Sequence, residues 1–214
     1  MKIISVILAR GGSKQIPRKN IINLNGLPLI SYSIKESLKS NSEKTYVSTD
    51  SEEIKEIALK YGANVFDRNP KYAQDSSSSE SALLEFAENI DFDILVFIQP
   101  TSCMIKYQNI NKGINMVLNE GYDSIFTAYN QHFFPEWSED LIPINFNLND
   151  KYPRRQDKES KLIDIGMFYV IKKEILLKNK FRLGGKIGTV EIPLIDSFQI
   201  DDMEDLKLVE KLMK

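Results

Sequence analysis

Short apolar runs alternate with segments of helical spacing along most of this chain of 214 residues, and this alternation constrains the fold more than any other feature. The apolar runs have the length and composition of strands, several of them buried on both faces: Ile3–Leu8, Thr45–Ser48, Ile94–Ile98 and Ser124–Ala128. Helical spacing occupies the intervals between them: Pro28–Lys39, Glu52–Tyr61, Glu80–Asn89 and Tyr107–Asn119. Such alternation predicts an α/β fold, with a mostly parallel sheet and helices on both faces.

The alternation breaks between Asn130 and Lys161 and then resumes. The later segments are two predicted strands and a closing helix: Ile165–Ile171, Gly188–Ile192 and Met203–Met213. The interrupting stretch carries Phe133, Phe134 and Trp137 and is too apolar for a disordered linker. We therefore predict a single domain over residues 1–214 with an excursion at about residues 130–164, a lid or a dimer arm. Its aromatic residues should be buried against the main sheet or against a partner subunit.

The first predicted strand ends in a glycine-rich, cationic loop, LARGGSKQIPRKN, from Leu8 to Asn20. Glycines let the backbone approach a ligand closely, and backbone N–H groups can bind phosphate oxygens. Lysine and arginine neutralise phosphate charge. The loop matches neither G-x-x-x-x-G-K-[ST] nor G-x-G-x-x-G. It indicates a polyphosphate site of another type, and the alternative is a solvated basic loop.

Composition excludes several classes of partner. The net charge of −2 gives no reason to expect nucleic acid, and a basic cluster on a near-neutral chain indicates a small anionic ligand. One cysteine and one histidine exclude an intramolecular disulfide and a cysteine or histidine metal centre, so a metal would be Mg²⁺ or Mn²⁺ held by carboxylates and phosphates. The N-terminal run is too short for a signal peptide, and no run reaches the roughly 20 residues of a membrane span. We expect a cytoplasmic protein without membrane contact.

Three segments directly follow predicted strands: the first loop, Ser48–Asp50 and Gln99–Ser102. Ligands of parallel α/β sheets bind at the carboxyl ends of the strands. We therefore predict that all three segments line one crevice.

Seven segments, in order, resemble the cytidylyltransferases that activate sialic acid and related nonulosonic acids: ARGGSKQIPRKN, STDSEEI, RNPKYAQDSSSS, IQPTS, YPRRQ, IGMFYV and SFQIDDMEDL. The resemblance covers nearly the whole chain. It implies a Rossmann-like nucleotidyltransferase fold and a homodimer formed through an inserted arm. It also implies an enzyme that joins CTP to an acidic nine-carbon sugar and releases pyrophosphate, for surface glycan synthesis.

The resemblance places the nucleotide at the first loop and at RNPKYAQDSSSS. The implied nucleotide-binding residues are Ala9, Arg10, Gly11, Gly12, Ser13, Lys14, Lys19, Asn20, Arg68 and Ser79. Arg10 and Lys14 are also the implied catalytic residues, because they would stabilise the departing pyrophosphate. Arg68 would approach the cytosine and Ser79 would hydrogen-bond it. The alternative for the serines at 76–79 is that they cap the next helix.

The same resemblance implies that Gln99, Arg154, Gln156 and Tyr169 bind the sugar. An arginine fork suits the carboxylate of an acidic sugar. Three alternatives stay open: Gln99 as a structural hydrogen-bonding residue, Arg155 in place of Arg154, and Tyr169 as a half-buried strand residue.

The metal site departs from the family pattern S-[IV]-D-I-D-T, because Gln199 stands in place of its first carboxylate. Alternate positions of a strand share a face, so we expect Gln199 and Asp201 on one side. Asp201 is the expected metal ligand and third catalytic residue, and the amide oxygen of Gln199 could add an uncharged ligand. Asp202 would cap the closing helix. Ile165 also departs from the family, which usually has Asn there.

Two alternatives to an acidic-sugar cytidylyltransferase stay open. The altered sugar-side motifs allow a related nucleotidyltransferase that uses another nucleotide or a non-ulosonic sugar. The loss of a carboxylate at Gln199 allows a non-catalytic nucleotide-binding protein, although the intact Lys14 and Asp201 argue against it.

Overall fold

The computed structural model describes residues 1–213, apart from the side chain of Arg155. The strands are β1 Ile3–Leu8, β2 Asn23–Leu24, β3 Leu27–Pro28, β4 Lys44–Thr49, β5 Asn64–Asp67, β6 Ile94–Ile98, β7 Ser124–Gln131, β8 Lys161–Lys172 and β9 Ile187–Glu191. The α-helices are α1 Leu29–Lys39, α2 Glu52–Lys60, α3 Ser79–Asn89, α4 Tyr107–Asn119, α5 Lys173–Asn179 and α6 Met203–Leu212. The 3-10 turns are η1 Lys19–Ile21, η2 Pro70–Tyr72, η3 Arg155–Asp157 and η4 Leu194–Asp196.

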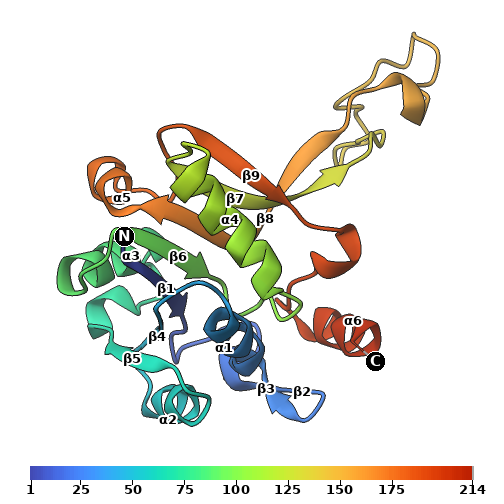
Figure 1. The fold of residues 1–214 in the computed structure, drawn as a ribbon. Coiled ribbons are helices and arrows are strands. Elements are labelled where there is room, and N and C mark those ends of the chain that lie inside the picture. Colours follow the sequence, from blue (N-terminus) through green and yellow to red (C-terminus); the bar gives the residue numbers. More distant parts are fainter. Residues whose placement is uncertain (214) are drawn as a thin grey trace.

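The main sheet has seven strands in the order β5-β4-β1-β6-β8-β7-β9 (Figure 1). β8 runs antiparallel to both of its neighbours, β6 and β7. The other four neighbouring pairs of this seven-stranded sheet are parallel. The mostly parallel sheet is therefore confirmed, with β8 as the exception.

Helices cover both faces of this sheet. On one face α1, α2 and α4 contribute side chains such as Ile30 and Ile110 to a core cluster that includes Val96 of β6. On the other face α3 contributes Phe86 to a second cluster that includes Phe97 of β6. Because neighbouring side chains of β6 enter opposite clusters, its whole sequence is apolar, as expected for a strand covered on both faces.

The segment between β9 and α6 returns to the end of β6. Ile200 is fully buried in a third cluster with Leu24, Leu206 and Val209. Its backbone N–H donates to the carbonyl of Thr101 at 3.2 Å. This anchoring brings the flanking residues of Ile200 to the edge where β6 ends.

Residues 132–160, between β7 and β8, project from the sheet as an arm (Figure 1). Within the arm Trp137 packs edge-on against Phe146, with ring centroids 5.1 Å apart, and Phe146 against Tyr152 at 5.7 Å. Phe134 and Trp137 remain 52% and 44% exposed. Burial of these aromatics against the main sheet is therefore contradicted, because the arm leaves the sheet instead of folding onto it.

Candidate active site

A polar cleft of about 490 Å³ opens where β1 and β6 end. Eight of the predicted site residues line it: Arg10, Ser13, Lys14, Lys19, Asn20, Arg68, Ser79 and Gln99. The first loop and the segment after β6 therefore meet in one cleft. Ser48–Asp50 does not line it, so that part of the crevice prediction is wrong. This segment instead accepts hydrogen bonds from the backbone of the first loop.

Arg10 and Lys14 converge on one carboxylate at the cleft wall. Arg10 Nη2 lies 3.0 Å from Asp75 Oδ1, and Lys14 Nζ lies 2.9 Å from Asp75 Oδ2. Arg10 Nη1 also donates to the carbonyl of Gln74 at 2.9 Å. The hydrogen bond from Lys14 is the main cause that lowers the pKa of Asp75 below its ordinary value. The two cations thus hold an anionic group in common, which is what phosphate binding would require of them.

The backbone of the first loop is held by protein acceptors. Ala9 N–H donates to the Ser48 carbonyl at 3.0 Å, and Gly11 N–H donates to Asp50 Oδ1 at 2.9 Å. A Cβ on Gly11 would lie 3.0 Å from Ser51 Cβ, so a larger residue would push the loop away from α2. Ala9, Gly11 and Gly12 are not among the residues that line the cleft. They shape the loop that presents the cations.

Asn20 and Arg68 are buried residues that hold the cleft together. Asn20 Nδ2 donates to the carbonyl of Arg10 at 3.0 Å. Arg68 donates from Nε to Ser48 Oγ at 3.0 Å and from Nη2 to the Ser48 carbonyl at 2.7 Å. Burial lowers the pKa of Arg68 to about 10, which leaves it charged at neutral pH. Arg68 is therefore a fixed cation in the cleft wall.

Ser79 is the first residue of α3 and lines the cleft. The capping interpretation is confirmed for its neighbour: Ser78 is the N-cap, and its hydroxyl accepts from Ser81 N–H at 3.1 Å. Capping by Ser78 sets the position at which α3 begins, and hence where Ser79 stands.

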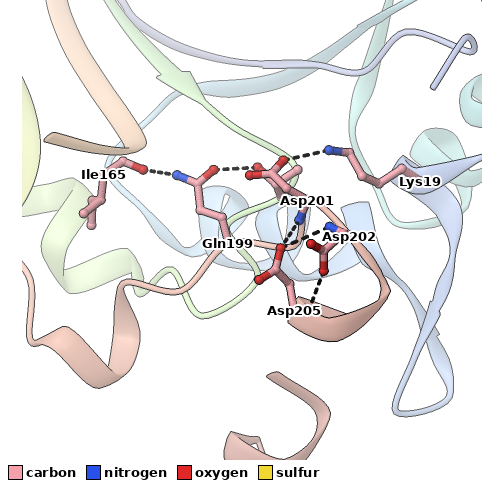
Figure 2. Close-up of polar contacts among 7 residues, drawn as sticks. Lys19, Ile165, Gln199, Asp201, Asp202 and Asp205 are labelled. Atoms are coloured by element: carbon pink, nitrogen blue, oxygen red, sulfur yellow. Dashed lines mark hydrogen bonds and ion pairs between the residues drawn. The ribbon is translucent and has the colours of Figure 1, made fainter. Parts of the chain in front are cut away.

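Lys19 and Asp201 form an ion pair beside the cleft, with Nζ 2.8 Å from Oδ1 (Figure 2). The side chain of Lys19 is 17% exposed and that of Asp201 is 60% exposed. The next residue, Asp202, caps α6: its Oδ1 accepts from Glu204 N–H at 2.8 Å and Asp205 N–H at 3.0 Å, as predicted. Of the two adjacent carboxylates, Asp201 therefore pairs with Lys19, and Asp202 caps a helix.

Gln199 does not lie on a strand, because residues 197–200 form no regular structure. The expectation that strand alternation places it on one face with Asp201 is wrong. Its Oε1 accepts from Thr101 Oγ1 at 3.0 Å, and its Nε2 donates to the carbonyl of Ile165 (Figure 2). Both ends of the amide therefore have protein partners.

Gln99 and Tyr169 meet at Gly166, in β8. A Cβ on Gly166 would lie 3.4 Å from Gln99 Nε2 and 3.5 Å from Tyr169 Oη, and the φ of +64° also favours glycine. Tyr169 is buried, stacks on Phe97 with centroids 5.7 Å apart and donates to Asp164 at 3.2 Å. Burial is the largest cause that raises the pKa of Tyr169 to about 12. Tyr169 does not line the cleft itself.

Arg154 and Gln156 belong to the arm and do not line the cleft of their own chain. Arg154 Nε donates to Asp157 Oδ2 at 2.7 Å, and the side chain of Arg154 is 71% exposed. The alternative Arg155 lies outside the described side chains. One chain alone therefore does not bring these residues to Gln99.

Several residues that line the cleft were not among the individual site residues predicted from the sequence: Gln15, Tyr72, Gln74, Asp75 and Thr101. All five lie within motifs that were recognised, but only the tertiary contact with Arg10 and Lys14 makes Asp75 informative. Within residues 1–213, no group of three or more His, Cys, Asp or Glu side chains is arranged to hold a metal. No helix of that part of the chain is long and apolar enough to span a membrane.

The fold is similar to that of solved nucleotidyltransferase structures. A CMP:2-keto-3-deoxy-manno-octonic acid synthetase complexed with CTP aligns with a TM-score of 0.75 at 18% identity, covering 100% of this chain and 98% of its own. A 4-diphosphocytidyl-2C-methyl-D-erythritol synthase from Anaerococcus prevotii aligns with a TM-score of 0.70 at 15% identity, covering 99% and 98%. These likenesses confirm the Rossmann-like fold.

The cytidylyltransferase family model matches residues 4–212, so the chain belongs to the cytidylyltransferase family. N-acylneuraminate cytidylyltransferase A of Danio rerio is 38% identical over 217 residues, which cover 98% of this chain and 50% of that protein. A pseudaminic acid cytidylyltransferase of Campylobacter jejuni is 32% identical over 229 residues, covering 100% and 97%. The chain thus spans about half the length of the Danio rerio relative and nearly all of the Campylobacter jejuni one.

Proposed function

We propose that this protein transfers CMP from CTP to an acidic nine-carbon sugar of the nonulosonic class, with release of pyrophosphate in the cytoplasm. The observation that carries the proposal is the convergence of Arg10, Lys14 and Lys19 on one cleft at the ends of β1 and β6. Three cations suit a triphosphate. The family and the two relatives described above support cytidine and an acidic sugar as the reactants.

In the proposed reaction the anomeric hydroxyl oxygen of the sugar bonds to the α-phosphorus of CTP. The bond from that phosphorus to its bridging oxygen breaks, and pyrophosphate leaves while the hydroxyl proton passes to solvent. Arg10 and Lys14 would exchange Asp75 for the triphosphate and stabilise the charge that develops on the leaving group. Arg68 and Ser79 would face the base, and Gln99 the sugar.

We also propose that Asp201 holds a divalent cation, Mg²⁺ or Mn²⁺, that helps to neutralise the triphosphate. An exposed carboxylate beside the cleft supplies the oxygen that such ions prefer, and the triphosphate would supply further oxygens.

CTP should bind more tightly than UTP, GTP or ATP, and only CTP with an acidic sugar should release pyrophosphate quickly. The physical reason is that Arg68 and Ser79 line the wall at which a base would be read by hydrogen bonds. Calorimetric titration with the four triphosphates and a pyrophosphate-release assay over nonulosonic and non-ulosonic acidic sugars measure both. A preference for GTP or ATP would contradict the cytidine assignment, and binding without turnover would favour the non-catalytic alternative.

We propose further that the protein is a homodimer in which each arm completes the sugar site of the partner subunit. The arm projects from the main sheet, contributes no residue to the cleft lining, and exposes a group of large apolar residues, which a partner would cover: Phe134, Trp137, Leu141, Ile142, Ile144, Leu148 and Tyr152. Arg154 would then leave Asp157 and pair with the sugar carboxylate.

Replacing Arg154 with Lys should raise the KM for the sugar about tenfold or more while sparing CTP binding, because lysine lacks the two-pronged fork. Steady-state kinetics separate the two substrates, and light scattering gives the assembly state. Co-expressing Arg154→Ala with Arg10→Ala chains sharpens the test. Mixed dimers should regain activity, since one of their two sites has both residues intact. A monomer, or a mixture without recovery, would contradict action across the dimer.

A further inference from the structure

Gln199 links two segments that arrive at the cleft from different parts of the chain (Figure 2). Its Oε1 accepts a hydrogen bond from Thr101, which follows β6 and lines the cleft. Its Nε2 donates to the carbonyl of Ile165, the residue before Gly166 in β8. The amide therefore connects the end of one strand with the middle of the adjacent one.

This position requires an acceptor at one end and a donor at the other. A neutral amide supplies both, whereas an ionised carboxylate supplies acceptors only. An aspartate or glutamate at 199 would accept from Thr101 but would place a negative oxygen against the Ile165 carbonyl. The contacts of Gln199 are thus matched to an amide, and a carboxylate there would leave its neighbours poorly paired.

Gln199 does not line the cleft itself but lies near Gln99 and Tyr169, the residues that the resemblance assigns to the sugar. Its Nε2 and that of Gln99 would each lie 3.4 Å from a Cβ on Gly166, and Tyr169 Oη would lie 3.5 Å away. Asp201, in contrast, pairs with Lys19 at 2.8 Å. The two positions that resemble a pair of carboxylates therefore have different partners: Asp201 contacts a cation, and Gln199 contacts Thr101 and the backbone next to Gly166.

We propose that Gln199 is a positioning residue for the sugar, which fixes the β8 backbone at Ile165 and Gly166 against Thr101, and that it is not a metal ligand. The inference rests on the proposed transfer of CMP to an acidic sugar. It assigns the departure from the two-carboxylate pattern to the sugar site, so the single carboxylate of Asp201 serves the metal.

Gln199→Glu tests this, because glutamate keeps the length and the acceptor but loses the donor. We expect the KM for the sugar to rise about tenfold or more, as for loss of a partly buried hydrogen bond next to a new charge. The Kd for CTP by calorimetry, and its dependence on magnesium, should not change. Gln108→Glu, at an exposed position of α4, makes the same charge change away from the cleft and should leave all three quantities at their wild-type values.

A lower magnesium requirement in Gln199→Glu, with an unchanged KM for the sugar, would overturn the inference and make residue 199 a ligand position. Thermal melting shows whether the variant folds. If it does not, Thr101→Val removes only the donor to Oε1 and should still raise the KM for the sugar, while Thr101→Ser should retain the wild-type value. A Thr101→Val enzyme with the wild-type KM would also overturn it. Failure of the proposed function would instead appear in the wild-type protein, as no pyrophosphate release with any acidic sugar.

Discussion

Alanine in place of Arg10 or Lys14 is expected to lower the turnover of CTP about ten- to a thousandfold, as for loss of one preorganised contact to developing charge. Both side chains line the cleft and reach the same carboxylate, Asp75. Stopped assays of pyrophosphate release give the rates. Folding should persist, because exposed ion pairs contribute little to stability, and thermal melting of each variant checks this.

Two further variants make the test specific to the cleft. Arg18→Ala removes a cation from the same loop, but Arg18 pairs with Glu53 outside the cleft and should be dispensable. Asp75→Asn should favour the use of CTP, whereas the alanine variants impair it. It removes the anion that competes for Arg10 and Lys14, so CTP should bind about two- to fivefold more tightly. Near-normal turnover in Arg10→Ala or Lys14→Ala would contradict the assignment of this loop to phosphate binding.

The parts of the fold that could be predicted are those with local signals. β1 and β6 begin and end at the predicted residues, because strands covered on both faces are almost entirely apolar, with Ser5 the exception in β1, and are followed by polar loops. α4 was predicted to the residue for the same kind of reason, since its buried side chains recur with helical spacing. The ordering of motifs then sufficed to predict the family and the cleft between the first loop and Gln99.

What could not be predicted depends on contacts between distant segments. The antiparallel direction of β8 follows from the arm, which returns the chain beside β7, and apolar spacing carries no sign of direction. Asp75 became informative only when Arg10 and Lys14 were found around it. Gln199 was assigned to a strand because alternate residues looked paired, yet its local path is set by Ile200 entering the core and donating to Thr101.

Asp201→Asn is expected to remove most of the activity and to raise the magnesium concentration needed for half-maximal rate. Asparagine keeps the size of the side chain but removes the charge that would hold a divalent ion. The ion pair with Lys19 makes a second role possible, since Asp201 could simply be the counter-ion of that lysine. The two roles differ in what the substitution does to the magnesium-dependent rate. Loss of a mere counter-ion would free Lys19 and tighten metal-free binding without loss of turnover, whereas loss of a ligand would slow the magnesium-dependent step.

Asp202→Asn is the matched control, because it makes the same change one residue away. Asp202 caps α6, and asparagine is about as good an N-cap as aspartate, so neither stability nor magnesium dependence should change. Rate against magnesium concentration for the wild type and both variants, with calorimetry of CTP in the presence and absence of magnesium, separates the two roles of Asp201. An unchanged magnesium dependence in Asp201→Asn would show that the ligand assignment is wrong. Both ends of the Gln199 amide are already hydrogen-bonded, to Thr101 and to Ile165. The cation of the triphosphate would then be bound without a carboxylate from this segment.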